Sequence, residues 1–282
     1  MIIIKLSKGL RDYLDKQNFS DKSIGFVPTM GALHEGHLSL IKESRKVAKL
    51  TVCSIFVNPV QFNNVDDLKK YPKTIENDIL LLEENGCDIL FLPGEKEIYP
   101  DAKSLEKHYD LGYLETILEG KFRPGHFQGV CMAVEKLLNI VDPGYLFMGQ
   151  KDFQQCMIIE RLIVLLHKNV QLIICPILRE KSGLAMSSRN VRLNSVERIK
   201  ASQLHKSLVS IKNKLTGNNF SALKNKTISH LEKIGFKVDY LELAKRKNLK
   251  IITHFNKGEE VVILVAAFLN DVRLIDNLLI KR

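Results

Sequence analysis

The chain has 282 residues, which is enough for one large domain or two medium ones with a buried core. Hydrophobic residues make up 45% and charged residues 26%, the balance of a soluble globular protein. No stretch of about 18 apolar residues lacks charge, so we expect no membrane span. The apolar start at residues 1–4 is too short to predict a signal peptide.

Five cysteines are dispersed along the chain without a CxxC pair. This spacing supports neither a zinc cluster nor a disulfide framework. It predicts reduced thiols, mostly buried as small apolar residues, in a cytoplasmic protein.

The net charge of +10 is concentrated near the end of the chain. Residues 1–180 hold 22 Lys and Arg against 24 Asp and Glu, whereas residues 181–282 hold 20 against 8. The basic residues are spaced through amphipathic helical patterns, which most often form a solvated face. Closure over an anionic substrate and binding of RNA are the alternatives.

Strand-like and helix-like patterns alternate from residue 23 to about residue 178. The predicted strands are 24–27, 51–57, 88–92, 145–148 and 170–178, and the predicted helices are 38–49, 74–85, 130–140 and 153–167. Such alternation predicts an α/β fold with a Rossmann-like parallel sheet covered by helices. We assign this first domain to residues 1–180.

The pattern changes after residues 181–183. Two long amphipathic helices, 195–215 and 220–234, precede strands at 238–243 and 260–269. We therefore expect residues 181–282 to form a smaller α+β C-terminal domain.

The most informative motif is the run of residues 28–37, Pro-Thr-Met-Gly-Ala-Leu-His-Glu-Gly-His, between the first predicted strand and its helix. A strand-to-helix turn of an open α/β sheet offers backbone N–H groups and a positive helix end to a phosphate. The imidazoles of His34 and His37 can donate hydrogen bonds to phosphoryl oxygens. Gly36 lets a nucleotide lie close to the backbone. The run predicts a nucleotide site.

Three further motifs follow strands of the predicted sheet. Asn58 and Gln61 offer amides at the end of the second strand, although an Asn-Pro turn is the better explanation of this motif taken alone. Lys151, in a strand-to-helix turn, can neutralise a phosphate. Ser187-Ser188-Arg189-Asn190 suits polyphosphate binding or forms a helix cap.

Residues 123–129, Arg-Pro-Gly-His-Phe-Gln-Gly, have the composition of a mobile loop that closes over a site. The acidic residues form no dense metal cluster. Asp78 or Asp152 could hold Mg²⁺ through water and substrate phosphates, and an exposed helix carboxylate is the alternative for Asp78.

These motifs together resemble the pantothenate synthetase (pantoate–β-alanine ligase) family over essentially the whole chain. PTMGALHEGH, FVNPVQF, RPGHFQGV, GQKDFQQ, MSSRN and the ending RLIDN stand in the family's order and spacing. The first motif alone indicates only the wider HxGH nucleotidyltransferases. Gln150 departs from the Glu that usually precedes the Lys.

The resemblance implies an AMP-forming ligase that joins (R)-pantoate to β-alanine through a pantoyl adenylate, with ATP as substrate and Mg²⁺ as cofactor. It implies His37 as the general acid, with His34 and Lys151 as further catalytic residues. It places pantoate and β-alanine at Gln61, Gln155 and Asn58, and Mg²⁺ at Asp78. The ATP-binding residues that it implies are Met30, Gly31, Ala32, Leu33, His34, Glu35, Gly36, His37, Gly149, Gln150, Lys151, Asp152, Leu178, Met186, Ser187, Ser188 and Arg189.

The same resemblance implies a homodimer whose C-terminal domain acts as a lid, with no nucleic-acid or membrane partner. Two alternatives stay open at this point. One is an RNA-binding protein, suggested by the basic C-terminal region, and the other is a nucleotidyltransferase that uses a different acid.

Overall fold

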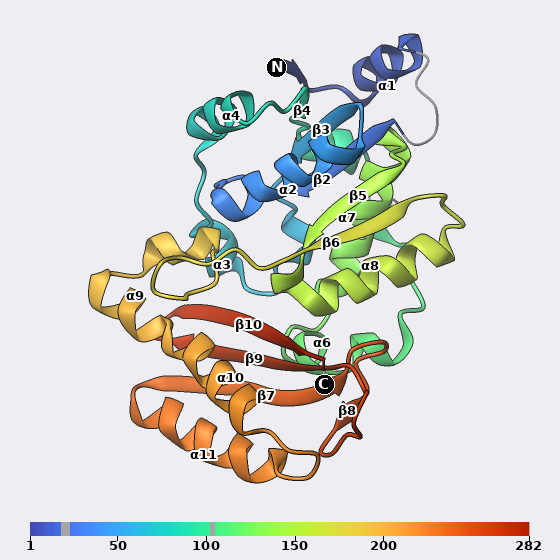
Figure 1. Ribbon diagram of the computed structural model, residues 1–282. Coiled ribbons are helices and arrows are strands. Elements are labelled where there is room, and N and C mark those ends of the chain that lie inside the picture. Colours follow the sequence, from blue (N-terminus) through green and yellow to red (C-terminus); the bar gives the residue numbers. More distant parts are fainter. Residues whose placement is uncertain (18–22, 102–104, 282) are drawn as a thin grey trace. The chain divides into compact units, whose positions relative to one another are not determined.

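The computed structural model describes residues 1–17, 23–101 and 105–281, which form two compact units (Figure 1). Unit 1 comprises Met1–Gly149 and Gln155–Pro176, and unit 2 comprises Gln150–Gln154 and Ile177–Arg282. The division therefore precedes the boundary expected near residues 181–183. It also assigns a short turn, residues 150–154, to unit 2.

Unit 1 contains the expected parallel sheet. Its six strands lie in the order β1-β4-β3-β2-β5-β6, and all pairs are parallel. The strands are β1 (Ile2–Ile4), β2 (Ile24–Thr29), β3 (Leu50–Ile55), β4 (Ile89–Phe91), β5 (Tyr145–Gly149) and β6 (Gln171–Cys175). The chain proceeds from β2 toward β4 on one side and returns to β5 on the other. The strand order thus reverses between β2 and β5, where open α/β sheets bind ligands.

Helices surround this sheet. They are α1 (Ser7–Lys16), α2 (Glu35–Val47), α3 (Val65–Lys69), α4 (Ile75–Glu84), α5 (Glu95–Ile98), α6 (Leu118–Phe122), α7 (His126–Val141) and α8 (Phe153–Leu165), with short 3-10 turns η1 (Pro59–Gln61) and η3 (Gly112–Glu115). The 3-10 turn η4 (Gln150–Asp152), which precedes α8, belongs to unit 2. Neighbouring residues of a strand face opposite sides. Phe26 packs in a core with α1 and α7, whereas Val27 packs in a second core with α2 and α4. Both faces of the sheet are therefore covered, as predicted.

Two local predictions for unit 1 need correction. Strand β1 was not predicted, because a three-residue apolar run at an exposed sheet edge carries little periodicity. The expected mobile loop at residues 123–129 is wrong for its second half. Helix α7 begins at His126, and the sharp turn before it is made by Gly125 at a φ of 79°.

Unit 2 has an antiparallel sheet in the order β10-β9-β7-β8. Its strands are β7 (Phe236–Lys245), β8 (Ile251–Ile252), β9 (Val261–Leu269) and β10 (Val272–Ile280). The helices are α9 (Ser195–Ala201), α10 (Gln203–Lys214) and α11 (Phe220–Lys233), preceded by the 3-10 turn η5 (Ser188–Arg192). The predicted α+β character is confirmed, with two strands, β8 and β10, beyond the two that were predicted.

The helix predicted at 195–215 is divided in two at Ser202. The Ser202 hydroxyl donates a 2.7 Å hydrogen bond to the carbonyl of Ile199 and so competes with the helical backbone pattern. Among the described residues, every helix is too short or too polar to cross a membrane.

Candidate active site

The turn between β2 and α2 is built around backbone conformations that need outside support. Gly31 and Ala32 both adopt positive φ, 77° and 49°. The Asp78 carboxylate holds this turn, since its Oδ2 accepts from the Ala32 N–H and its Oδ1 from the Leu33 N–H, each at 2.8 Å. Two consecutive amides are thereby aimed at one carboxylate from α4. A left-handed alanine costs free energy, and these charge-assisted bonds offset it.

Asp78 is the residue to which the resemblance assigned Mg²⁺. It is 1% exposed and accepts a third hydrogen bond, 3.0 Å long, from the Thr74 hydroxyl. Among the described residues there is no group of three or more His, Cys, Asp or Glu side chains able to hold a metal. These contacts make Asp78 a structural clamp for the turn. The alternative of an exposed helix carboxylate is wrong.

The histidine pair stands at the start of α2. His34 is the N-cap residue, and its Nδ1 accepts a 3.1 Å hydrogen bond from the Gly36 N–H. In a neutral ring the proton then resides on Nε2, so His34 offers a donor at that atom. The rings of His34 and His37 stack, with centroids 4.0 Å apart and planes 23° apart. The structure thus brings the two imidazoles together at a helix N-terminus, where anions are favoured.

Asn58 lies at the carboxyl end of β3 and is 1% exposed. Its Oδ1 accepts from the Tyr99 hydroxyl at 2.9 Å and from the Val60 N–H at 3.3 Å. Its Nδ2 donates to Gln61 Oε1 and to the Gly129 carbonyl, both at 3.0 Å. Every polar atom of the Asn58 amide therefore has a partner in the protein. Asn58 is better placed to orient Gln61 than to touch a ligand.

Gln61 receives a defined orientation from these contacts. Because its Oε1 accepts from Asn58, its Nε2 faces outward to Met30, with a distance of 3.1 Å to the Met30 Sδ. A thioether is a weak acceptor, so the Gln61 amide keeps donor capacity for a ligand oxygen. Sequence reasoning missed Tyr99 as part of this network. Burial is the main cause that raises the pKa of the Tyr99 hydroxyl, which keeps it a donor at neutral pH.

His126 and Phe127 support the same region from α7. They are 5% and 1% exposed, and His126 Nδ1 lies 2.8 Å from the Gln61 carbonyl oxygen. A Cβ at Gly129 would come within 2.6 Å of the Val60 carbonyl oxygen. These residues form a packed base beneath residues 58–61 and not a loop that closes. Gln155 lies half-buried in the first turn of α8, after the switch-point strand β5.

Apart from Gly149, which ends β5 in unit 1, the remaining predicted ATP-binding residues lie in unit 2. Lys151 is half-buried in η4, with its Nζ 3.5 Å from Asp152 Oδ2. Leu178 is 40% exposed and joins Met186 through a 3.0 Å backbone hydrogen bond from the Met186 N–H to the Leu178 carbonyl. The structure therefore places Leu178 and Met186 opposite each other in one hairpin.

The serine motif follows that hairpin. Ser187 is the N-cap of η5, and its hydroxyl accepts a 3.3 Å bond from the Arg189 N–H. Ser188 is 8% exposed. The structure thus confirms that Ser187 caps this turn.

The chain was compared with known proteins. The sequence profile described as Pantoate-beta-alanine ligase matches residues 2–279. A pantothenate synthetase from Cytophaga hutchinsonii is 43% identical over 285 residues, 99% of each chain. The crystal structure of pantothenate synthetase from Thermus thermophilus matches with a TM-score of 0.89 at 35% identity, covering 99% of both chains.

A further similar structure is that of a complex with ligands. It is the pantoate-beta-alanine ligase from Francisella tularensis complexed with beta-gamma ATP and beta-alanine, with a TM-score of 0.81 and 38% identity. The match covers 99% of this chain and 97% of that one. Full-length agreement in both sequence and fold confirms the resemblance drawn from the motifs. The chain belongs to the pantoate-beta-alanine ligase family.

Proposed function

We propose that this chain condenses (R)-pantoate with β-alanine to give pantothenate, at the expense of ATP, the activity of the family to which it belongs. The observation that carries the proposal is the stacked pair His34 and His37 at the N-terminus of α2, beside the switch point of the sheet. A phosphate-binding helix end with two imidazole donors suits transfer of an adenylyl group.

The reaction divides into two displacements. A pantoate carboxylate oxygen attacks the α-phosphorus of ATP, the bond to the β-phosphate oxygen breaks, and pyrophosphate leaves. The amine of β-alanine then attacks the acyl carbon, loses a proton, and displaces AMP. Neither step needs a covalent protein nucleophile, so positioning and charge stabilisation are the protein's contributions.

Unit 1 contributes the histidines to this scheme. The His34 Nε2–H is a donor for a phosphoryl oxygen, and His37 acts as the general acid toward the departing pyrophosphate. The backbone from Met30 to Gly36 lies close to the nucleotide, which the Asp78 clamp makes possible by fixing the Ala32 and Leu33 amides.

Unit 2 contributes cationic and hairpin residues. Lys151 neutralises charge at the α-phosphate, Leu178 and Met186 contact the adenine, and Arg189 binds the outer phosphates. The other ATP-binding residues in this proposal are Gly149 of unit 1 and Gln150, Asp152, Ser187 and Ser188 of unit 2.

Pantoate and β-alanine are assigned to unit 1. The oriented Gln61 Nε2 donates to an oxygen of pantoate, and the Gln155 amide supplies a second contact. Asn58 acts by holding Gln61 in its orientation. Selectivity for a hydroxy acid follows, because a site built to hydrogen-bond a substrate hydroxyl rejects acids that lack it.

Mg²⁺ enters this proposal with ATP. Its usual ligands are substrate phosphates and water, and it would supply charge neutralisation on the triphosphate. The two oxygens of Asp78 accept three hydrogen bonds, so we expect this carboxylate to act on the turn and the ion to be held by phosphates and water. A homodimer and a cytoplasmic location stay predictions. Membership of the family supports the homodimer, and five buried cysteines outside any disulfide support the cytoplasmic location.

The basic residues of unit 2 do not favour an RNA-binding function. Lys206, Lys212 and Lys214 of α10 are exposed on a helix whose other face is buried by Leu204, Leu208 and Ile211. That arrangement is the solvated face of an amphipathic helix.

Pantoate-dependent exchange of labelled pyrophosphate into ATP tests the proposed adenylation. Exchange should require pantoate and proceed without β-alanine, whereas AMP release should require both. Exchange with another hydroxy acid but not with pantoate would identify a different substrate. AMP formation that ignores β-alanine would refute the ligase reaction.

A further inference from the structure

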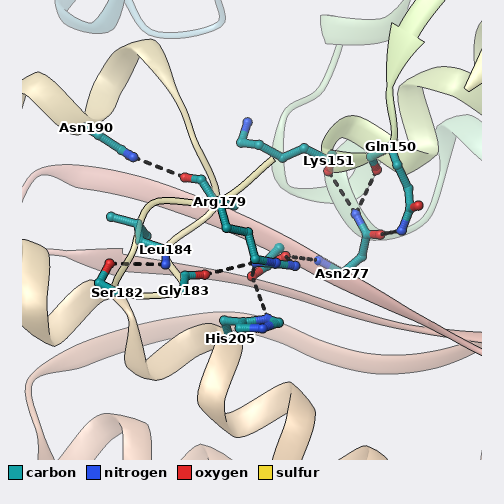
Figure 2. Close-up of polar contacts among 11 residues, drawn as sticks. Gln150, Lys151, Arg179, Ser182, Gly183, Leu184, Asn190, His205 and Asn277 are labelled. Carbon is teal, nitrogen blue, oxygen red and sulfur yellow. Dashed lines mark hydrogen bonds and ion pairs between the residues drawn. The ribbon is translucent and has the colours of Figure 1, made fainter. Parts of the chain in front are cut away.

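Strand β10 carries two consecutive buried polar side chains that the proposed reaction does not use. Asp276 is 4% exposed and Asn277 is 1% exposed. Successive residues of a strand point to opposite faces of the sheet. The two side chains therefore reach two different segments of unit 2, and both of those segments carry proposed ATP-binding residues. Figure 2 shows Asn277 beside Gln150 and Lys151.

Asn277 holds the turn that bears Lys151. Its Nδ2 donates to the carbonyl oxygens of Gln150 and Lys151, at 2.9 Å and 3.0 Å. Its Oδ1 accepts from Gln150 Nε2 at 3.0 Å. Both donors and the acceptor of one buried amide are thus used on two adjacent residues, 126 and 127 positions earlier in the chain.

The Asn277 side chain acts on Lys151 by holding the backbone of Lys151. A lysine has four rotatable side-chain bonds, and a fixed backbone removes the largest source of variation in where its ammonium group can lie. An electrostatic contact to a transferring phosphoryl group depends on such placement. The Asn277 side chain bonds to η4, so it acts on the phosphoryl group through Lys151.

Asp276 holds the hairpin that bears Leu178 and Met186. Its carboxylate binds the Arg179 guanidinium through two contacts, Nη1 to Oδ2 at 2.7 Å and Nη2 to Oδ1 at 2.9 Å. Arg179 Nη1 also donates to the Gly183 carbonyl at 3.2 Å, across the turn of the hairpin. The ion pair therefore fixes the turn between the two residues assigned to adenine.

His205 of α10 lies beside this ion pair, with its Nδ1 3.8 Å from Asp276 Oδ2. Burial, followed by the nearby Arg179 charge, lowers the pKa of His205. The imidazole is therefore neutral at pH 7, and Arg179 is the cation that binds the carboxylate. The two contacts of this bidentate pair fix the orientation of the guanidinium as well as its position.

We propose that Asn277 and Asp276 are positioning residues for ATP, one fixing the Lys151 turn and the other the Leu178–Met186 hairpin. The inference rests on the proposed adenylation reaction. It makes the C-terminal strand a determinant of ATP affinity although neither side chain is assigned a contact with ATP.

Two matched pairs of variants test the proposal. Asn277→Ala is compared with Asn219→Ala, because Asn219 also donates from Nδ2 to a backbone carbonyl, that of Lys214 at 2.9 Å. Asp276→Asn is compared with Asp239→Asn. Asp239 lies in β7 and pairs at 2.8 Å with Arg273, which lies in β10 as Asp276 does. The bond from Asn219 to Lys214 and the bond between Asp239 and Arg273 lie outside η4 and outside the Leu178–Met186 hairpin.

The measurements are the KM for ATP and the KM for pantoate in the pyrophosphate exchange assay, together with Tm. We expect Asn277→Ala and Asp276→Asn each to raise the KM for ATP by about tenfold, equivalent to ~1.4 kcal/mol. The KM for pantoate should stay within about twofold, and Tm reports whether each variant remains folded at the assay temperature. A tighter version of the first test is Asn277→Asp, which keeps the volume but sets a carboxylate against two carbonyl oxygens.

The outcomes are distinct. If the wild-type chain shows no pantoate-dependent exchange, the proposed function fails before any variant is compared. If the wild type exchanges and the variants match their controls in the KM for ATP, the positioning role is refuted. If Asn277→Ala does not fold, Asn277→Asp decides by the same criterion, and an equal rise in both KM values would also refute the proposal.

Discussion

The Tyr99 hydroxyl donates to the Asn58 Oδ1 at 2.9 Å and, together with the Val60 N–H on the same oxygen and the Gly129 carbonyl on Nδ2, fixes which end of the Asn58 amide faces Gln61. With Oδ1 engaged, Nδ2 must donate, so Gln61 Oε1 accepts and Gln61 Nε2 turns outward. A phenol that touches no proposed ligand thereby helps to orient the amide that does.

Replacing Tyr99 with Phe should weaken pantoate binding. The Asn58 Oδ1 loses one of its two hydrogen bonds, so the Asn58 amide holds Gln61 less firmly in the orientation that faces the substrate. Loss of one neutral hydrogen bond predicts a cost of about 1 kcal/mol, or roughly a fivefold rise in the KM for pantoate. Tyr113→Phe, at a side chain that is 48% exposed, is the control. An unchanged KM for pantoate in Tyr99→Phe would show that the Tyr99–Asn58–Gln61 hydrogen bonds do not contribute to pantoate binding.

Replacing His37 with Ala should lower turnover by roughly 10²-fold or more, because a general acid and an electrostatic contact are lost together. The exposed His230 of α11 offers the matched substitution and should leave turnover unchanged. Steady-state rates of AMP release measure both. Normal turnover in the His37 variant would remove it from the mechanism.

Replacing Asp78 with Asn should destabilise the protein without altering its need for Mg²⁺. The neutral amide can accept only at one atom, so a backbone N–H of the turn faces an NH₂ group. We expect a loss of about 2 kcal/mol in the free energy of unfolding, measured by urea denaturation. The Mg²⁺ concentration at half-maximal rate should match that of the wild type. A several-fold increase in that concentration would instead identify Asp78 as a magnesium ligand.

Replacing Lys151 with Ala should impair adenylation more than folding. The lysine is half-buried, and its ion pair to the neighbouring Asp152, at 3.5 Å, contributes little to stability. We expect the exchange rate to fall by at least about tenfold, as loss of a charge at a phosphoryl group predicts, with Tm close to that of Lys214→Ala. Normal exchange combined with a lower Tm would give Lys151 a structural role only.

The parallel sheet and the position of its ligand edge could be predicted because they depend on local patterns. Short Val- and Ile-rich runs such as Leu50–Ile55 mark strands buried on both faces, and the His motif follows one of them directly. The same logic failed for β10, where Arg273, Asp276 and Asn277 interrupt the apolar alternation. Their partners lie elsewhere in the chain, so only tertiary contacts explain why these residues are buried.

The roles of Asp78 and His126 were out of reach for a related reason. Asp78 binds backbone N–H groups 45 and 46 residues away, and such partners leave no trace in side-chain patterns. His126 follows Pro-Gly, which is typical of a loop, yet Gly125 at positive φ starts a helix there.

Transfer of ¹⁸O from labelled pantoate tests the central claim most directly. If the carboxylate attacks the α-phosphorus and β-alanine then attacks the acyl carbon, one carboxylate oxygen must leave with the nucleotide. With both carboxylate oxygens labelled, we predict AMP that carries one ¹⁸O and pantothenate that keeps the other at its new amide. Label in inorganic phosphate with formation of ADP, or unlabelled AMP, would contradict the account.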